Sequence, residues 1–501
     1  MNSIRITTKY RYITYFSFFS ILTALYFHIG KTVGFNSDGV ANILEAESIV
    51  NGNIILHGWT LPSDTFYTLD TQLDVFFTLL GISGKIIYHL TPAVIYASLL
   101  VLVFYIVKNI SNSYYISLIS LTVFLACPES FYKSGVLFSP IHVMTIFFIV
   151  LAFYVYHLGE IKFKYVYSFL LLYFAIVGDP YALFVGVAPI VCYSLLMIFR
   201  EPNINSFTSS HIKMIVSSVM AAVLAKVTVH IIGAEGGYHV VHNQMKFVSL
   251  DRFGHNIYLF LYSILAVTQS NFFGRQLLSY ETIIDIIHAL LIVLAVILLA
   301  VHIKRPEQKD MPAIVKLSLI AILLSCFAFV FSTEPIDIGA SRYLLDIPVF
   351  VAILFGYLLS IFKSRRMYVF LALSAAAIFV GFIYRSFEAA PASEEGYIKV
   401  IKFLEKHNLH YGFAGYWNAA PFTLLSNQNV KVRQVRVDAR GSILPYAWLS
   451  NSQWYKDIKH PQFIIIGKSE NFGLKESVLD KNYGAPKKTK IIGNYKVFVY
   501  R

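Results

Sequence analysis

Two acidic residues and one arginine stand at the ends of long apolar segments, where they could act together in a chemical step. Asp38 follows the first apolar segment, Asp179 lies in the sharp GDPY turn between two others, and Arg342 precedes a fourth. A carboxylate within hydrogen-bond reach of a hydroxyl group can act as a general base. An arginine guanidinium holds two phosphate oxygens at once and keeps its charge. These residue types therefore suit a transfer from a phosphate-bearing carrier to a hydroxyl group.

Five further residues are candidates for the same site: four lie near the ends of apolar segments, and Asp64 lies in the acidic stretch 34–85. They are Asp64, Glu129, Lys133, His142 and Tyr343. Glu129 and Lys133 share the turn CPESFYKSG, where they could equally form an ordinary surface pair.

Each leading candidate also has a purely structural interpretation. Asp38 could cap a helix that starts near Val40, and Asp179 could form a turn ahead of Pro180. Arg342 could anchor the end of a membrane span among lipid head groups. The sequence leaves both interpretations open for all three residues.

The composition indicates where these residues are held. The chain has 501 residues, of which 57% are hydrophobic and only 14% are charged, whereas soluble proteins carry roughly 25% charged residues. The apolar residues come in blocks of about 17–22, long enough to cross a hydrocarbon core of ~30 Å as helices. This pattern excludes a soluble enzyme, a disordered chain and a fibrous protein. It predicts a polytopic α-helical membrane protein with about eleven spans.

The turns between the blocks predict an orientation. The predicted spans are 14–33, 86–107, 114–127, 140–157, 165–178, 181–199, 213–232, 283–303, 314–332, 344–362 and 367–384. Alternate turns carry basic residues, namely Lys108, Lys162, Lys164, Arg200, Lys213, Lys304, Arg305, Lys363, Arg365 and Arg366. Positive charge marks cytoplasmic turns, which places the N-terminus in the cytoplasm and everything after about residue 384 on the other side. Residues 257–282 fit a re-entrant or interfacial helix better than a span.

Two polar regions lie on the predicted outer side. The first is the acidic stretch 34–85, in which residues 40–50 have the spacing of an amphipathic helix on a membrane surface. The second is 386–501, where helix and strand patterns alternate and predict a small α/β domain. The segment 489–501 is expected to form its last strand. Residues 1–385 would then form the transmembrane catalytic domain.

Several of these features resemble a known superfamily. The long acidic first outer loop, the RYLL motif at 342–345 and the stretch FAGYWNAAPFTLLSNQNVKVRQV at 413–435 look like the GT-C superfamily. Its members are membrane glycosyltransferases that use sugars linked to polyprenyl phosphate. In size and layout the chain is similar to the bacterial Gtr-type glucosyltransferases that modify O-antigen.

The resemblance implies roles for particular residues. Asp38 corresponds to the catalytic acid of the first outer loop and Asp179 to the acid of the second. Arg342, with Tyr343 beside it, corresponds to the contact with the donor phosphate. The first loop has no DxD motif, since Asp38 is followed by Gly39 and Val40. We therefore predict neither a metal nor another cofactor.

The predicted function is the transfer of one sugar, glucose or another hexose, from a polyprenyl-phosphate carrier to a surface glycan such as O-antigen. The reaction would take place on the outer side of the bacterial inner membrane, in lipopolysaccharide biosynthesis, with the C-terminal domain in the periplasm. The partners would be the lipid-linked donor, a glycan acceptor and membrane lipids. The net charge is +13, but many of the Lys and Arg residues sit in short turns between apolar blocks and no arginine-rich helix stands out, so no nucleic acid is expected. A transporter or flippase is the alternative, and a non-catalytic scaffold is a third class.

Overall fold

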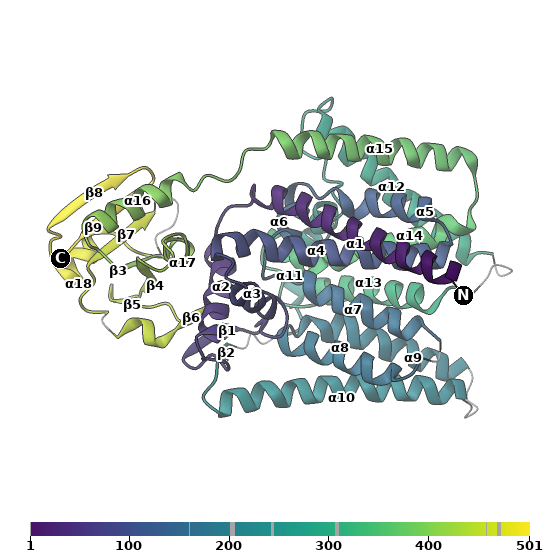
Figure 1. Ribbon diagram of the computed structural model, residues 1–501, viewed down its shortest axis with the longest axis horizontal. Coiled ribbons are helices and arrows are strands. Elements are labelled where there is room, and N and C mark those ends of the chain that lie inside the picture. Colours follow the sequence, from purple (N-terminus) through teal and green to yellow (C-terminus); the bar gives the residue numbers. More distant parts are fainter. Residues whose placement is uncertain are drawn as a thin grey trace.

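The chain forms a long helical bundle with a small α/β domain at one end (Figure 1). The computed structural model describes residues 2–159, 161–200, 206–241, 245–305, 310–456, 458–467 and 472–501. The N-terminus and the C-terminal domain lie at opposite ends of the bundle. An extended linker leads from the last bundle helix to the domain.

Helices account for most of the described bundle. They are α1 (Asn2–Gly30), α2 (Ser37–Val50), α3 (Asp70–Leu79), α4 (Gly84–Ser111), α5 (Tyr114–Leu121), η1 (Thr122–Ala126), α6 (Ser130–Val136), α7 (Val143–His157), α8 (Lys164–Gly178), η2 (Leu183–Val187), α9 (Ala188–Arg200), α10 (Ser206–Ala234), α11 (Leu250–Val267), α12 (Tyr280–Ile303), α13 (Ala313–Phe331), η3 (Ile338–Leu344), α14 (Asp346–Ile361) and α15 (Arg365–Glu388). Here η1 and η2 are π-helical and η3 is a 3-10 helix.

Seven helical segments in the described part are long and apolar enough to cross a membrane, or nine if each of two bent pairs is one span. One pair, α5–η1 with α6, bends by 96° at a break that contains Pro128, which cannot continue a helix. The other pair, η3 with α14, bends by 41°. The two remaining predicted spans fall on the shorter apolar helices α7 and α8. The chain is thus a polytopic α-helical membrane protein, as predicted.

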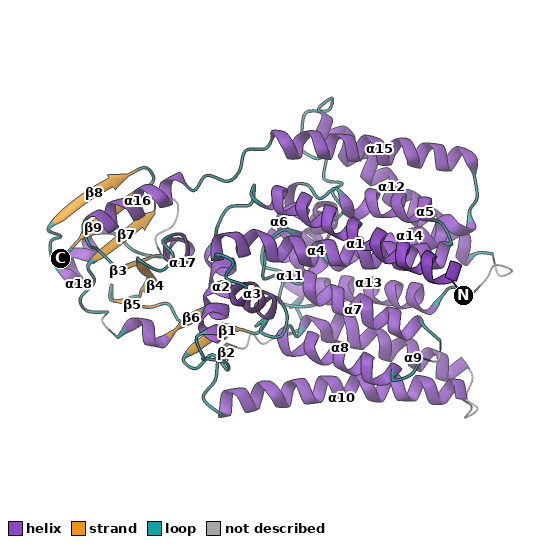
Figure 2. Cartoon of the chain, viewed as in Figure 1, coloured by secondary structure: helices purple, strands orange, loops and turns teal. Residues whose placement is uncertain are grey.

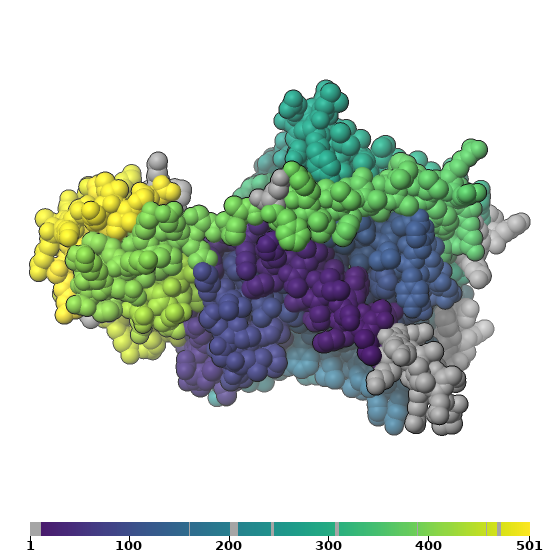
Figure 3. Space-filling model, turned by 45° about the horizontal axis from the view of Figure 1, so that its top comes forward, coloured from purple at the N-terminus to yellow at the C-terminus, as the bar shows by residue number. Residues whose placement is uncertain are grey.

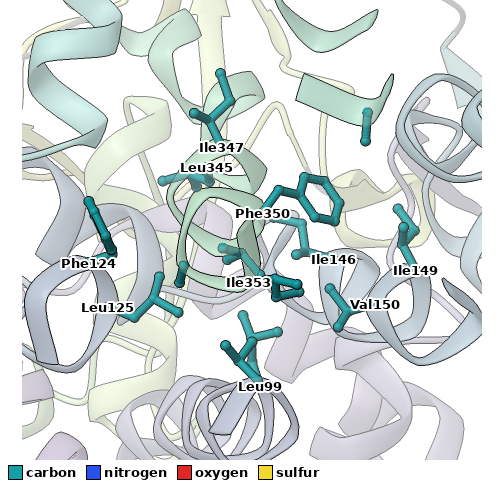
Figure 4. Packing of buried hydrophobic residues seen from close by; sticks show 14 of the residues in the cluster. Leu99, Phe124, Leu125, Ile146, Ile149, Val150, Leu345, Ile347, Phe350 and Ile353 are labelled. Carbon is teal, nitrogen blue, oxygen red and sulfur yellow. The ribbon is translucent and has the colours of Figure 1, made fainter. Parts of the chain in front are cut away.

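The core of the bundle surrounds α14, which is buried along most of its length. Side chains from α4, η1 and α7 pack around it, and Figure 4 shows Phe350 and Ile353 facing Ile146 and Leu99. Burial of apolar side chains on every side of one helix is typical of a helix at the centre of a bundle. This packing fixes the start of α14, and with it the position of η3.

The C-terminal domain is built on a six-stranded sheet (Figure 2). Its elements are α16 (Glu395–Lys406), β3 (Tyr411–Ala414), α17 (Tyr416–Leu425), β4 (Lys431–Val437), β5 (Ile443–Pro445), η4 (Ser452–Tyr455), β7 (Phe463–Gly467), α18 (Glu476–Tyr483), β8 (Lys488–Ile492) and β9 (Tyr495–Val499). The strand order is β5-β4-β3-β7-β9-β8, with β4, β3 and β7 parallel. Helices α16 and α17 pack on one face, and α18 packs on the other. The predicted α/β domain is confirmed.

The C-terminal segment, for which one strand over 489–501 was expected, differs from that expectation. It forms two strands, β8 and β9, which pair in antiparallel fashion across Gly493 and Asn494. Gly493 has a φ of +57°, a conformation that suits the tight turn of a hairpin. The expectation of one closing strand was therefore wrong.

A second, three-stranded sheet joins the domain to the bundle. Its strands are β2 (His239–Val241), β1 (Trp59–Pro62) and β6 (Ser450–Asn451), in that order. β1 pairs with β2 in parallel and with β6 in antiparallel fashion. In the space-filling view the domain abuts the dark-blue segment that follows α1 (Figure 3). The two parts of the protein are therefore linked by main-chain hydrogen bonds as well as by the linker.

The helix predicted over residues 40–50 exists as α2, but it does not lie exposed on a membrane surface. Most of its residues from Ser37 to Ala46 are buried. α3, α4 and α17 pack around it. The spacing of its apolar residues was correctly recognised, but the surface that they cover belongs to the protein itself.

Candidate functional site

A cavity of about 310 Å³ lies where the bundle meets the C-terminal domain. We call it the central cavity. Its walls come from α2, the segment after β1, the start of α7, the turn after α8, α13, η3 and the residues before β6. Six of the eight predicted site residues line it, namely Asp38, Asp64, His142, Asp179, Arg342 and Tyr343. Residues more than 300 positions apart in the sequence thus share one space.

Asp38 lies in the first turn of α2, and it does not cap this helix. The cap is Asn36, whose side-chain oxygen accepts a hydrogen bond of 3.1 Å from the Gly39 amide. The Asp38 carboxylate instead accepts a hydrogen bond from the Tyr416 hydroxyl. Burial raises the pKa of Asp38, and this hydrogen bond and the charge of Arg342 partly offset the rise. The capping interpretation of Asp38 was therefore wrong.

Asp179 is buried at the end of α8 and holds His142. Its Oδ2 lies 2.7 Å from His142 Nδ1 and accepts a hydrogen bond of 2.6 Å from Thr145. Its Oδ1 accepts the Tyr181 amide at 3.0 Å, so Asp179 also shapes the turn. Asp179 therefore both forms the turn and lines the cavity.

The His142 ring packs against two tyrosine rings. Its centroid lies 4.6 Å from that of Tyr181 and 5.2 Å from that of Tyr343. The described part of the chain provides no hydrogen-bond partner for His142 Nε2. Since Nδ1 is engaged by Asp179, Nε2 is the ring nitrogen left to contact a ligand. The arrangement presents one oriented ring nitrogen to the cavity.

Arg342 projects from η3, just before α14. Its guanidinium lies 5.1 Å from the Tyr343 ring centroid and donates a hydrogen bond of 3.2 Å to the Tyr343 hydroxyl. Within the described residues no carboxylate lies within 4 Å of it, although Asp38 and Asp64 are near enough to act on its charge. An exposed guanidinium without an ion-pair partner is available to an anionic ligand.

Asp64 follows β1 and is partly buried in the cavity wall. Burial raises the pKa of its carboxyl, while the charges of His142 and Arg342 act in the opposite direction. Asp64 and Asp38 therefore share Arg342 as a charged neighbour.

Glu129 and Lys133 do not line the central cavity. Glu129 faces a separate cavity of about 210 Å³ and pairs with Arg385 at the end of α15. Lys133 follows it on α6 and lines neither cavity. The bend before α6 turns residues 129–133 towards α15. Their position next to an apolar block in the sequence therefore did not indicate a position in the central cavity. The expectation that these two residues join the site was wrong.

Several residues that line the central cavity were not among the predicted site residues. The C-terminal domain contributes Trp448 and Leu449, and α2 contributes Asn42 and Glu45. No local pattern brings Trp448 to α2, because the contact depends on the tertiary fold. For α2 a signal was present: Asp38, Asn42 and Glu45 are spaced as one face of a helix.

Metal ligands require several donors at one place. Within the described ranges, no group of three or more His, Cys, Asp and Glu side chains is arranged to hold a metal ion. Each described carboxylate that lines the cavity either accepts hydrogen bonds from protein groups or faces the cavity without belonging to such a group.

Comparison with known proteins gives matches in shape only. No family model and no curated protein matches the sequence. A cryo-EM structure of the arabinofuranosyltransferase AftD from Mycobacteria is similar with a TM-score of 0.42 and 9% identity, over 96% of this chain and 41% of that chain. A crystal structure of the Archaeoglobus fulgidus oligosaccharyltransferase is similar with a TM-score of 0.46 and 10% identity, over 90% of this chain and 68% of that one. This chain thus spans less than half of the mycobacterial enzyme, and the likeness is one of broad outline.

Proposed function

We propose that the protein is a GT-C-type glycosyltransferase that moves a sugar from a polyprenyl-phosphate carrier to a glycan hydroxyl. The observation that carries the proposal is that Asp38 and Arg342 line one cavity at the end of a membrane helix bundle. A lipid tail can lie among the helices while its phosphate reaches Arg342. The carboxylate of Asp38 is then within the same space as the sugar.

The proposed reaction is a direct displacement at the anomeric carbon. A hydroxyl oxygen of the acceptor forms the new bond to this carbon, and the bond from carbon to the phosphate oxygen breaks. The bonding electron pair leaves with the polyprenyl phosphate, whose charge Arg342 stabilises. Asp38 accepts the hydroxyl proton as general base. His142, held by Asp179, contacts the reactants from the opposite wall.

The finer assignments belong to the same proposal. The sugar is a single hexose such as glucose, and the acceptor is a surface glycan such as O-antigen. The site faces the periplasm of a bacterial inner membrane, with the N-terminus in the cytoplasm. The basic turns of the sequence support this orientation.

Mass analysis of surface glycan from cells with and without the protein tests the function. One added hexose per acceptor unit is expected only in the presence of the protein. An unchanged glycan together with altered solute uptake would instead support a transporter.

Purified variants test the site with polyprenyl-phosphate hexose as donor. Loss of a general base costs about 10²–10⁴-fold in rate, so Asp38→Asn should lose that much transfer. Arg342→Ala should raise the donor KM and lower kcat. Asp480→Asn and Arg366→Ala make the same chemical changes at exposed positions outside the cavity and should transfer normally. Wild-type rates in both site variants would remove Asp38 and Arg342 from the mechanism.

A further inference from the structure

Glu45 is a buried carboxyl group that faces the central cavity without a partner. It lies on α2, it is 1% exposed, and it lines the cavity. Neither carboxyl oxygen has a hydrogen-bond partner among the described residues. Buried polar groups are nearly always hydrogen-bonded, so an exception requires an explanation. α3, α4 and α17 pack around the helix, and Glu45 lines the cavity, so a ligand in the cavity can supply the missing partner.

The position of Glu45 separates it from the phosphate end of the cavity. Seven residues separate it from Asp38, which is about 10 Å along a helix. The charge of Arg342 acts on Asp38 and Asp64, whereas the charged neighbour of Glu45 is Asp74. A donor sugar attached to a phosphate at Arg342 lies near Asp38. Glu45 therefore lies beyond the general base, on the side where the rest of an acceptor must extend.

The polar side chain between Asp38 and Glu45 on α2 is Asn42, and its hydrogen-bonding groups already have protein partners. Asn42 donates a hydrogen bond of 2.5 Å to Asp74, and its side-chain oxygen accepts one of 2.7 Å from Thr71. On this face of α2, Asp38 and Glu45 thus remain to meet a ligand. Asn42 lies between them in the cavity wall, and Asp74 holds its side chain.

The surroundings of Glu45 favour an uncharged ligand. Burial, followed by the nearby Asp74 carboxyl, raises the pKa of Glu45 well above its ordinary value. The other titratable groups that act with it are Tyr238 and Tyr416, neither of which is a cation. A protonated carboxyl both donates and accepts a hydrogen bond. That combination matches two neighbouring hydroxyl groups and does not match a phosphate or a carboxylate.

We infer that Glu45 binds the acceptor: its carboxyl holds two neighbouring hydroxyls of a glycan, so that a further hydroxyl reaches Asp38. The inference rests on the proposed glycosyl transfer and names the acceptor class as a polyhydroxyl sugar chain. Glu45 determines acceptor binding and takes no part in bond breaking.

The experiment uses the full-length protein in lipid nanodiscs with radiolabelled polyprenyl-phosphate hexose. The acceptor probe is surface polysaccharide purified from cells that lack the protein. Transfer is measured against acceptor concentration, and donor hydrolysis is measured with no acceptor present. Glu45→Ala should raise the acceptor KM about tenfold or more, since two hydrogen bonds are lost. Its donor KM and its donor hydrolysis should stay at the wild-type values.

Glu45→Gln keeps one donor and one acceptor in the same shape, and its acceptor KM should stay within about threefold of wild type. Glu47→Ala is the matched control on the same helix, because Glu47 contacts Gln428 and does not line the cavity. It should transfer normally. An unchanged acceptor KM in Glu45→Ala, or equal losses in the Ala and Gln variants, would overturn the inference. A wild-type protein that neither transfers nor hydrolyses the donor would instead refute the proposed function.

Discussion

The hydroxyl of Tyr416 donates a hydrogen bond to the carboxylate of Asp38, although 378 residues separate them in the sequence. Tyr416 begins α17 of the C-terminal domain, and Asp38 lies in the first turn of α2 of the bundle. The backbone carbonyl of Tyr416 also accepts a hydrogen bond from the Ser37 hydroxyl. The C-terminal domain is therefore part of the wall that holds the proposed general base.

Replacing Tyr416 by Phe should change the pH dependence of transfer. The hydrogen bond from Tyr416 lowers the pKa of Asp38 against the effect of burial, so its removal raises that pKa further. A general base works as the carboxylate, and the acid limb of kcat/KM should therefore move to higher pH. At a fixed pH on that limb, transfer should fall by about threefold to tenfold. Trp417→Phe, at the exposed neighbouring position, should leave the pH profile unchanged. An unshifted acid limb in Tyr416→Phe would contradict this role.

His142 and Asp179 should act as one unit. Asp179 orients the His142 ring through Nδ1, so removing either partner removes the same contact with the substrate. We expect His142→Ala, Asp179→Asn and the double variant to lose transfer to a similar extent, about 10²-fold. Measured kcat/KM values for the four proteins of this cycle test the expectation. Losses that multiply in the double variant would show that the two residues act separately.

The helices of the bundle could be predicted from the apolar blocks of the sequence. Each long block gave a helix, because only a helix pairs its own backbone groups inside a membrane. α7 and α8 were also found from their blocks, although both are short. Asp38, Asp179 and Arg342 line one cavity, since alternate ends of successive spans lie on the same side of the bundle.

Other features depend on tertiary contacts that no local pattern encodes. Tyr416 and Trp448 reach the site only because the C-terminal domain folds back on α2. Glu129 looked like a site residue, but the bend before α6 pairs it with Arg385. The β8–β9 hairpin was missed although its Gly493-Asn494 turn is a typical hairpin signal.

Gly39 is a position where a single methyl group should disturb the site. A Cβ there would lie 2.7 Å from the Ser139 carbonyl oxygen and 2.8 Å from a Tyr88 ring carbon. Since a backbone carbonyl cannot move aside easily, Gly39→Ala should push α2 away from residues 138–140 and displace Asp38. A displacement of about 1 Å can cost about 10²-fold in rate, measurable as kcat in nanodiscs.

The control for this substitution is Gly254→Ala on α11. A Cβ at Gly254 meets nothing within 4 Å, and alanine is favoured over glycine inside a helix. This variant should be folded and fully active. Equal kcat values for Gly39→Ala and the wild type would show that α2 can shift without cost.

Asp70 should make the stability of the protein depend on pH. Burial raises its pKa from 3.8 to about 8, and burial also raises that of Asp74 to about 7. The folded state therefore binds these protons more tightly than the unfolded state, and stability should fall as the pH rises from about 4 to about 8. Asp70→Asn mimics the protonated form and should weaken this dependence. Tm values of the detergent-solubilised protein across this range provide the measurement, and Asp480→Asn is the control.

The short sheet of β2, β1 and β6 has a consequence for how the protein is made. Its middle strand is synthesised early, but the strand on one side arrives only when the ribosome has passed Asn451. A nascent chain that stops before Trp448 lacks the residues that line one side of the cavity, even if its bundle helices have already folded. The central cavity can therefore be complete only once residues 448 and 449 have been made, after all the bundle helices have been synthesised.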